Sequence, residues 1–196
     1  SGASFTKEEL FRDYWGLVDE AMENIGYKEF IVTKNGSVTF FEAVSRADLI
    51  RHALSKVTTK QTGVGIFIQD PREIIPCMVG VVKGGNYFAV FDVEFPETTI
   101  MDMIHDAKIK VILTTNQFIS KIQPAIGGTI PIINIDQLDK NVLLKKIPVE
   151  YSPEDVVQIL FTSGSTGKPK GAIEDYRYLM RAVHVKLNTY EFNEDD

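Results

Sequence analysis

LFTSGSTGKPKG, from Leu160 to Gly171, is the most informative stretch of this sequence. It continues an apolar run, VVQILF at 156–161, that is typical of a buried strand. Glycines in such a loop let backbone N–H groups turn toward an anion and let the anion approach closely. Hydroxyls add further donors, and lysines add positive charge. We therefore predict a phosphate-binding loop whose contacts come from Thr162, Ser163, Gly164, Ser165, Thr166, Gly167, Lys168 and Lys170.

Two common motifs with similar residue types do not fit this stretch. The Walker phosphate loop has four residues between its first glycine and its Gly-Lys pair, whereas two separate Gly164 from Gly167, and Pro169 follows the lysine. A hydrolase nucleophile elbow needs a glycine two positions before its serine, but Ser163 stands there relative to Ser165. The usual nucleotide-triphosphatase and hydrolase interpretations are therefore excluded.

Bulk composition describes one globular domain. The chain has 196 residues, 44% hydrophobic and 24% charged, which is enough for one sizeable core. A formal net charge of -6 argues against a nucleic-acid partner, and no apolar run is long enough to predict a membrane span. The single cysteine, Cys77, cannot form an internal disulfide and fits a reducing, cytoplasmic location. We interpret residues 1–4 as a remnant of tag cleavage and 5–196 as the domain.

Apolar periodicity and turn residues predict a strand–helix alternation from about residue 64 onward. GVG at 63–65 runs into a strand rather than a helix, so the Rossmann fingerprint fails. The predicted helices are 5–25, 41–54, 73–83, 98–107, 117–122 and 176–188. The predicted strands are 30–33 and 37–40, joined as a hairpin by Asn-Gly, then 64–68, 87–91, 110–114, 130–135, 156–161 and 171–174.

This order predicts an α/β fold with a doubly wound, mostly parallel sheet flanked by helices, preceded by an N-terminal helix and hairpin. Pro131 places the strand at 130–135 at an edge of the sheet. Pro76 is expected to be tolerated only near the first turn of its helix. The charged segment 136–154 is predicted to be irregular and the most mobile connection. Ligands bind beyond the carboxyl ends of strands in such sheets, which is where the 162–171 loop is expected.

TSGSTGKPKG at 162–171 matches, without a departure, the signature phosphate loop of the adenylate-forming (AMP-binding) superfamily. VTFFEA at 38–43 and VKGGNYFAVFD at 82–92 resemble the first two adenylation-domain motifs. The spacing is most similar to the N-terminal part of a nonribosomal peptide synthetase adenylation domain. The sequence departs from the family motifs at two places, which bear on the subfamily and not on the superfamily. Val90 and Val93 stand where the second motif usually has prolines, and Asp175-Tyr176-Arg177 replaces a commoner His-Arg pattern after the loop.

The resemblance implies a ligase that uses ATP and Mg²⁺ to convert a carboxylic acid, by preference an amino acid, to an acyl-adenylate. The acyl group would then form a thioester with the phosphopantetheine of a carrier protein or with CoA. The loop would hold the β- and γ-phosphates through the backbone amides of 164–167, the hydroxyls of Ser163, Ser165 and Thr166, and Lys168 or Lys170.

Later family motifs are not found in this sequence, including those for adenine, ribose and the catalytic lysine. We therefore expect a truncated part of the large N-terminal domain, inactive alone, with no catalytic residue of its own. His52, His105 and His184 lack metal-ligand spacing, so no metal site is predicted. Two alternatives stay open: an acyl-CoA synthetase-type ligase, and a non-catalytic binding or interaction module.

Overall fold

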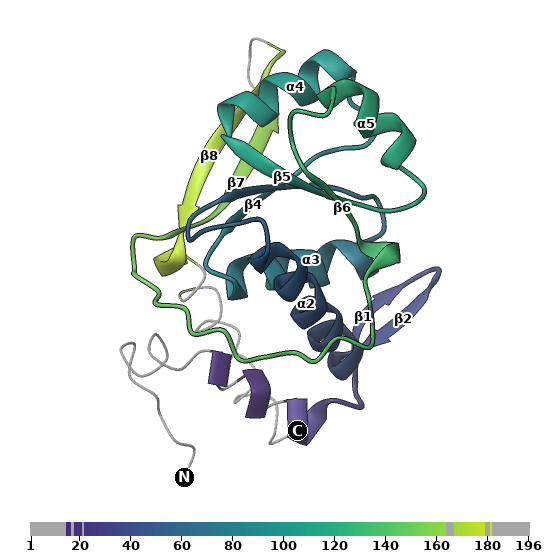
Figure 1. Ribbon diagram of the computed structural model, residues 1–196, viewed down its shortest axis with the longest axis vertical. Coiled ribbons are helices and arrows are strands. Elements are labelled where there is room, and N and C mark those ends of the chain that lie inside the picture. The colour runs from purple at the N-terminus through teal and green to yellow at the C-terminus, as the bar shows by residue number, and fades with distance from the viewer. Residues whose placement is uncertain (1–14, 17, 21, 164–166, 179–180, 182–196) are drawn as a thin grey trace, which may run out of the picture.

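The computed structural model describes residues 15–163 and 167–181, apart from 17, 21, 179 and 180. Its centre is a six-stranded sheet in the order β6-β5-β3-β4-β7-β8 (Figure 1). The strands are β3 (Gly63–Phe67), β4 (Tyr87–Val90), β5 (Ile109–Thr114), β6 (Ile132–Asn134), β7 (Val156–Ser163) and β8 (Pro169–Asp175). All neighbouring strands are parallel except β7 and β8, which form an antiparallel pair.

Helices cover both faces of this sheet, as Figure 1 shows. Helices α2 (Phe40–Ser55) and α3 (Pro71–Lys83) lie on one face, and α4 (Glu97–Asp106) and α5 (Ile119–Ile126) lie on the other. The buried core on the first face includes Ile50, Leu54, Val64, Ile66, Cys77 and Val81. The core on the second face includes Phe67, Phe91, Ile100, Met103, Ile112 and Ile122. Successive β3 residues therefore serve opposite faces, which explains its unbroken apolar run.

Local sequence sets where the first two helices begin. Thr39 caps α2 because its hydroxyl accepts from the Glu42 N–H, while the Glu42 carboxylate accepts from the Thr39 N–H. Asp70 caps α3 by accepting from the Arg72 N–H, and Pro71 occupies the first helical position. The two helices then approach closely at Gly80, where a Cβ atom would lie 2.7 Å from the Ala47 carbonyl oxygen. These signals fix one helical layer of the fold.

Most predicted elements are confirmed. The hairpin consists of β1 (Glu29–Thr33) and β2 (Gly36–Thr39), the strand–helix alternation is present, and β6 lies at a sheet edge. The described residues between 15 and 25 are helical, and so are those at 176–178 and 181. The other residues of those two predicted helices lie outside the described part of the chain.

Most boundaries differ from the prediction by one or two residues, and some of these differences have a clear physical cause. Helix α5 runs from Ile119 to Ile126 instead of 117–122, because a turn fills 115–118 and Gly127, at φ 58°, ends the helix. Pro76 lies in the second turn of α3, since that helix already begins at Pro71. Strand β8 spans Pro169–Asp175 rather than 171–174, because its pairing with β7 continues as far as Pro169.

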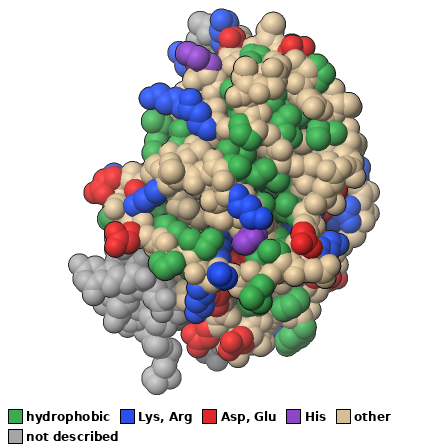
Figure 2. All heavy atoms as spheres, in the orientation of Figure 1, with side chains coloured by type: hydrophobic (Ala, Val, Ile, Leu, Met, Phe, Trp, Pro, Cys, Tyr) green, Lys and Arg blue, Asp and Glu red, His purple; other side chains and the backbone are tan. Residues whose placement is uncertain are grey.

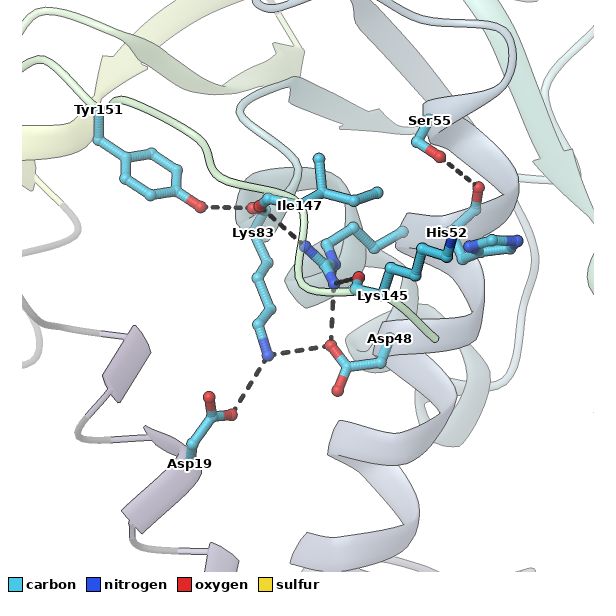
Figure 3. A network of polar contacts seen from close by, with 9 residues as sticks. Asp19, Asp48, His52, Ser55, Lys83, Lys145, Ile147 and Tyr151 are labelled. Carbon is cyan, nitrogen blue, oxygen red and sulfur yellow. Dashed lines mark hydrogen bonds and ion pairs between the residues drawn. The ribbon is translucent and has the colours of Figure 1, made fainter. Parts of the chain in front are cut away.

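The predicted irregular segment 136–154 begins with the end of a short 3-10 helix (Ile135–Gln137) and is irregular from 138 onward. Residues 138–155 cross the α2–α3 layer as an extended strap. Figure 3 shows Lys145, Ile147 and Tyr151 of this strap beside the helical layer. Arg51 of α2 donates to the carbonyl oxygens of Lys145 and Ile147, at 3.4 Å each. The Tyr151 hydroxyl donates to the Lys83 carbonyl oxygen. The Lys83 ammonium in turn pairs with Asp48 at 2.9 Å. The strap therefore reaches β7 from a fixed position on the helical layer.

The single cysteine, Cys77, is a buried core residue. Cys77 is fully buried within α3, and burial raises the pKa of its thiol because the thiolate would lose its hydration. The thiol is therefore a core group. Among the described residues, no helix is both long and apolar enough to cross a bilayer.

Candidate phosphate-binding site

The predicted loop lies at the carboxyl edge of the parallel sheet. Strand β7 runs parallel to β4, so its last residue, Ser163, points the chain toward the same edge as the ends of β3, β4 and β5. This edge is where ligands bind in open α/β sheets. Figure 1 shows the β7–β8 hairpin reaching past the sheet beside α4.

The structure shortens the loop relative to the sequence prediction. Thr162 pairs with Lys170 and Ser163 pairs with Pro169, so the strands include both ends of the 162–171 motif. Only 164–168 separate the two paired strands. Residues 162–163 and 169–170 were predicted as loop because this stretch is polar and glycine-rich. They are strand residues in the structure because β7 and β8 pair with each other there.

The described tip residues are open to solvent. Gly167 adopts φ 77°, a backbone conformation that favours glycine, and a Cβ atom there would meet no described atom within 4 Å. The Lys168 side chain is 84% exposed, and its ammonium lies 3.9 Å from the Asp102 carboxylate of α4. An ion pair this long and exposed is largely screened by water. Lys168 is therefore available to an anion at the tip.

A close contact anchors the hairpin to the core beneath α4. The Phe161 ring of β7 lies 6.4 Å from the ring of Phe91, measured between centroids. On β8, a Cβ atom at Gly171 would stand 2.9 Å from a methyl carbon of Ile159 and 3.4 Å from the Phe161 ring. The final glycine of the motif is thus needed for close strand contact, whereas Gly167 serves the open turn.

The motif departure at 175–177 has a structural role. The Asp175 carboxylate accepts from the backbone N–H groups of Arg177 and Tyr178, at 3.0 and 3.3 Å. This is the arrangement of an N-cap, and it starts the helix after β8. The same carboxylate pairs with the Arg177 guanidinium at 2.6 Å. Sequence reasoning missed this role, although an aspartate just before a helix is a recognised start signal.

Arg177 holds the pKa of the Asp175 carboxyl below its ordinary value, chiefly through their side-chain hydrogen bond. A carboxyl whose pKa is lower in the folded state stabilises the fold above the unfolded value, about 3.9, and loses that effect as the pH falls through the folded pKa. We expect Arg177→Gln to raise the pKa of Asp175 toward the ordinary value, measured by NMR titration of its carboxyl carbon. Arg46→Gln serves as the control. An unchanged pKa of Asp175 in Arg177→Gln would contradict the pairing.

The structure describes part of the predicted binding set. The described and exposed members are Thr162, Gly167, Lys168 and Lys170. The backbone of Ser163 ends β7. Gly164, Ser165 and Thr166 lie outside the described residues. The structure thus brings Thr162 and Lys170 side by side on neighbouring strands and places Lys168 beside α4.

Other candidate chemistry is sparse in the described part of the chain. No group of three or more His, Cys, Asp or Glu residues there could hold a metal ion. His105 is exposed and lies 3.4 Å from its neighbour Asp106, while His184 lies outside the described residues. Basic and acidic side chains are interspersed on the face that Figure 2 shows. The hairpin tip therefore stays the best-defined candidate site.

Comparison with known proteins identifies the family. The family model for AMP-binding enzymes matches residues 18–196, so the chain belongs to the AMP-binding enzyme family. A similar curated protein is gramicidin S synthase 2 of Brevibacillus brevis, 29% identical over 182 residues. That match covers 92% of this chain but only 4% of the synthase. The resemblance inferred from the loop and the two upstream motifs is confirmed.

Solved structures share the fold. The N-terminal subdomain of Klebsiella oxytoca NpsA superposes with a TM-score of 0.69 at 22% identity, over 85% of this chain and 42% of that one. A fatty acyl-adenylate ligase from L. pneumophila, solved with acyl adenylate and pyrophosphate, gives 0.75 at 18% identity, over 86% of this chain and 31% of the ligase. The chain thus spans less than half of each of these proteins.

Proposed function

We propose that this chain carries the phosphate-binding loop of an AMP-forming adenylation enzyme, which uses ATP to activate a carboxylic acid as an acyl-adenylate. The observation that carries the proposal is the position of the 162–171 motif at the tip of a hairpin on the carboxyl edge of a parallel sheet. Membership of the AMP-binding family supports the use of ATP. We further propose an amino acid as the substrate, on the similarity to gramicidin S synthase 2.

The described residues fit a polyphosphate. Lys168 and Lys170 are exposed cations within three residues of each other, and the backbone at Gly167 is open to close approach. Phosphate oxygens accept hydrogen bonds from both kinds of donor. The Asp102 carboxylate near Lys168 would lose its weak pairing when an anion of higher charge arrives.

ATP, when bound, supplies the α-phosphate that a carboxylate attacks and the pyrophosphate that leaves. Lys168 and Lys170 would pair with the β- and γ-phosphates, whose negative charge grows as the bond to the α-phosphate breaks. The backbone N–H groups at the tip would donate to the same oxygens. Donors that are already in place stabilise this charge without reorganising, which lowers the barrier.

The remaining partners are proposed on the same basis. We assign the acyl group to the phosphopantetheine of a carrier protein rather than to CoA, again on the similarity to gramicidin S synthase 2. Mg²⁺ would accompany ATP, and we propose no ligand for it among the described residues. We propose that these 196 residues are inactive alone and that adenylation needs further parts of an adenylation enzyme. ATP–pyrophosphate exchange by the 196 residues alone would contradict this proposal.

Amide NMR of the chain during titration with pyrophosphate tests the proposal. We expect the largest chemical-shift changes at the amides of Gly167, Lys168, Lys170 and Gly171, because these amides lie at the proposed contact. AMP, which lacks the β- and γ-phosphates, should give smaller changes at the same concentration, and sulfate serves as the control for adventitious anion binding. Shifts scattered over distant surface lysines, or equal shifts with sulfate, would refute the assignment.

A further inference from the structure

The β7–β8 hairpin has few backbone links to the rest of the sheet. Within the described residues, the ladder between β4 and β7 contains one paired position, Phe88 with Gln158. By contrast, β7 and β8 pair from Val156 with Asp175 to Ser163 with Pro169, with one register irregularity between Val156 and Gln158. Something other than the β4–β7 ladder must therefore fix where β7 begins relative to the sheet.

A side-chain amide supplies that link. Gln61, just before β3, accepts from the Val156 N–H at 2.8 Å and donates to the Val156 carbonyl oxygen at 3.0 Å. The Gln61 side-chain amide also donates to the Gly85 carbonyl oxygen at 3.3 Å, and the Gln61 backbone N–H donates to the same oxygen at 2.9 Å. The Gln61 amide thus pairs with the first residue of β7 as a neighbouring strand residue would.

The backbone at Gln61 is in an unfavourable conformation for this residue type. Its φ is 63°, in the left-handed region that non-glycine residues rarely occupy. Among the described non-glycine residues, only Lys108, at φ 53°, shares a positive φ. A glutamine at this position costs conformational free energy that its three side-chain hydrogen bonds can offset.

Neighbouring contacts also hold the base of the hairpin, both just before β7 and just after β8. The Lys60 ammonium lies 3.1 Å from the Asp155 carboxylate, just before β7. The Asp155 carbonyl oxygen accepts from the Tyr176 N–H at 2.8 Å, just after β8. Tyr176 is 1% exposed, so this end of the hairpin is buried in the core. The hairpin therefore has a fixed base, with the loop at its far end.

We propose that Gln61 is a positioning residue for the phosphate-binding loop. Its amide fixes the start of β7, and the paired strands carry that register about 20 Å to the tip, at about 3.3 Å per residue. A slip of one residue would turn Phe161 away from the core and reverse the faces of Thr162 and Lys170. This inference rests on the proposed function, because the loop must bind an anion for its position to matter.

Gln61→Gly tests the proposal, because glycine adopts the positive φ without strain and removes the side chain that carries the amide. We expect amide hydrogen exchange in β7 and β8 to become at least tenfold faster, with β3 and β5 unchanged. The dissociation constant for pyrophosphate, measured by NMR titration, should rise at least threefold. Gln61→Asn tolerates the positive φ and keeps the amide on a side chain one methylene shorter, so it should give intermediate values. Lys108→Gly relieves the other positive φ and should change neither quantity.

Two results would overturn the positioning role. One is uniformly faster exchange in every strand, which indicates general destabilisation. The other is faster exchange in β7 and β8 with unchanged pyrophosphate affinity, which indicates a structural role alone. If Gln61→Gly does not fold, hydrogen exchange and pyrophosphate affinity are compared between wild type and Gln61→Asn instead. If the wild-type chain binds no pyrophosphate, the proposed function fails instead, and exchange in β7 still decides whether Gln61 holds the hairpin.

Discussion

Phe91→Ala is expected to lower the free energy of unfolding by about 3–5 kcal/mol, the usual cost of removing a fully buried phenylalanine. Phe91 has no exposed surface and lies in the core between the sheet and α4. Its ring contacts Phe161, and a Cβ atom at Gly65 would come within 2.6 Å of it. The surrounding strands are paired on both sides, so the cavity left by alanine cannot collapse.

Urea unfolding monitored by circular dichroism measures this loss. Phe41→Ala is the matched control, because Phe41 lies on α2 with 55% of its surface exposed and should cost less than about 1 kcal/mol. A loss below about 1 kcal/mol for Phe91 as well would contradict the described core. Faster hydrogen exchange in β7 should accompany the Phe91 loss, because Phe161 loses its aromatic neighbour.

Much of the fold could be predicted because its signals are local. The unbroken apolar run at 64–68 indicates a strand buried on both faces, and Asn35-Gly36 indicates the first hairpin. The capping residues Thr39 and Asp70 are also visible in the sequence, although the predicted helices begin later, at 41 and 73. These features depend on neighbours within a few residues, so periodicity and turn residues were sufficient.

Features that depend on distant segments could not be predicted in this way. The length of β8 depends on pairing with β7 as far as Pro169, which no local pattern indicates. The end of α5 was also missed, because the helix continues through Pro124 to Ile126. The motif supplied the residue types of the candidate site, but nothing in the sequence linked Lys168 to Asp102 or Gln61 to Val156, which is 95 residues away.

Replacing Lys168 and Lys170 together by alanine is expected to weaken pyrophosphate binding by at least about tenfold. A hydrogen bond to a charged group contributes about 1.5–3 kcal/mol, and about 1.4 kcal/mol corresponds to tenfold in affinity. Both side chains are exposed at the tip, so their removal should leave the core intact. Equal urea midpoints for variant and wild type would verify that the fold is unchanged.

The matched control is the double variant Lys108→Ala and Lys110→Ala, which removes the same charge. These lysines flank Ile109 at the start of β5, and are therefore at the edge of the parallel sheet opposite the loop. We expect this variant to bind pyrophosphate within about twofold of wild type, because charges beyond the Debye length, about 8 Å at physiological salt, are largely screened. The comparison separates contact at the loop from a change in net charge.

Pyrophosphate affinity in these two double variants and the wild-type chain is the most direct test that 162–171 is a phosphate-binding loop. The loop variant should lose at least about tenfold while the β5 variant retains wild-type affinity. Equal affinity in all three proteins, or an equal loss in both variants, would show that pyrophosphate does not bind at Lys168 and Lys170.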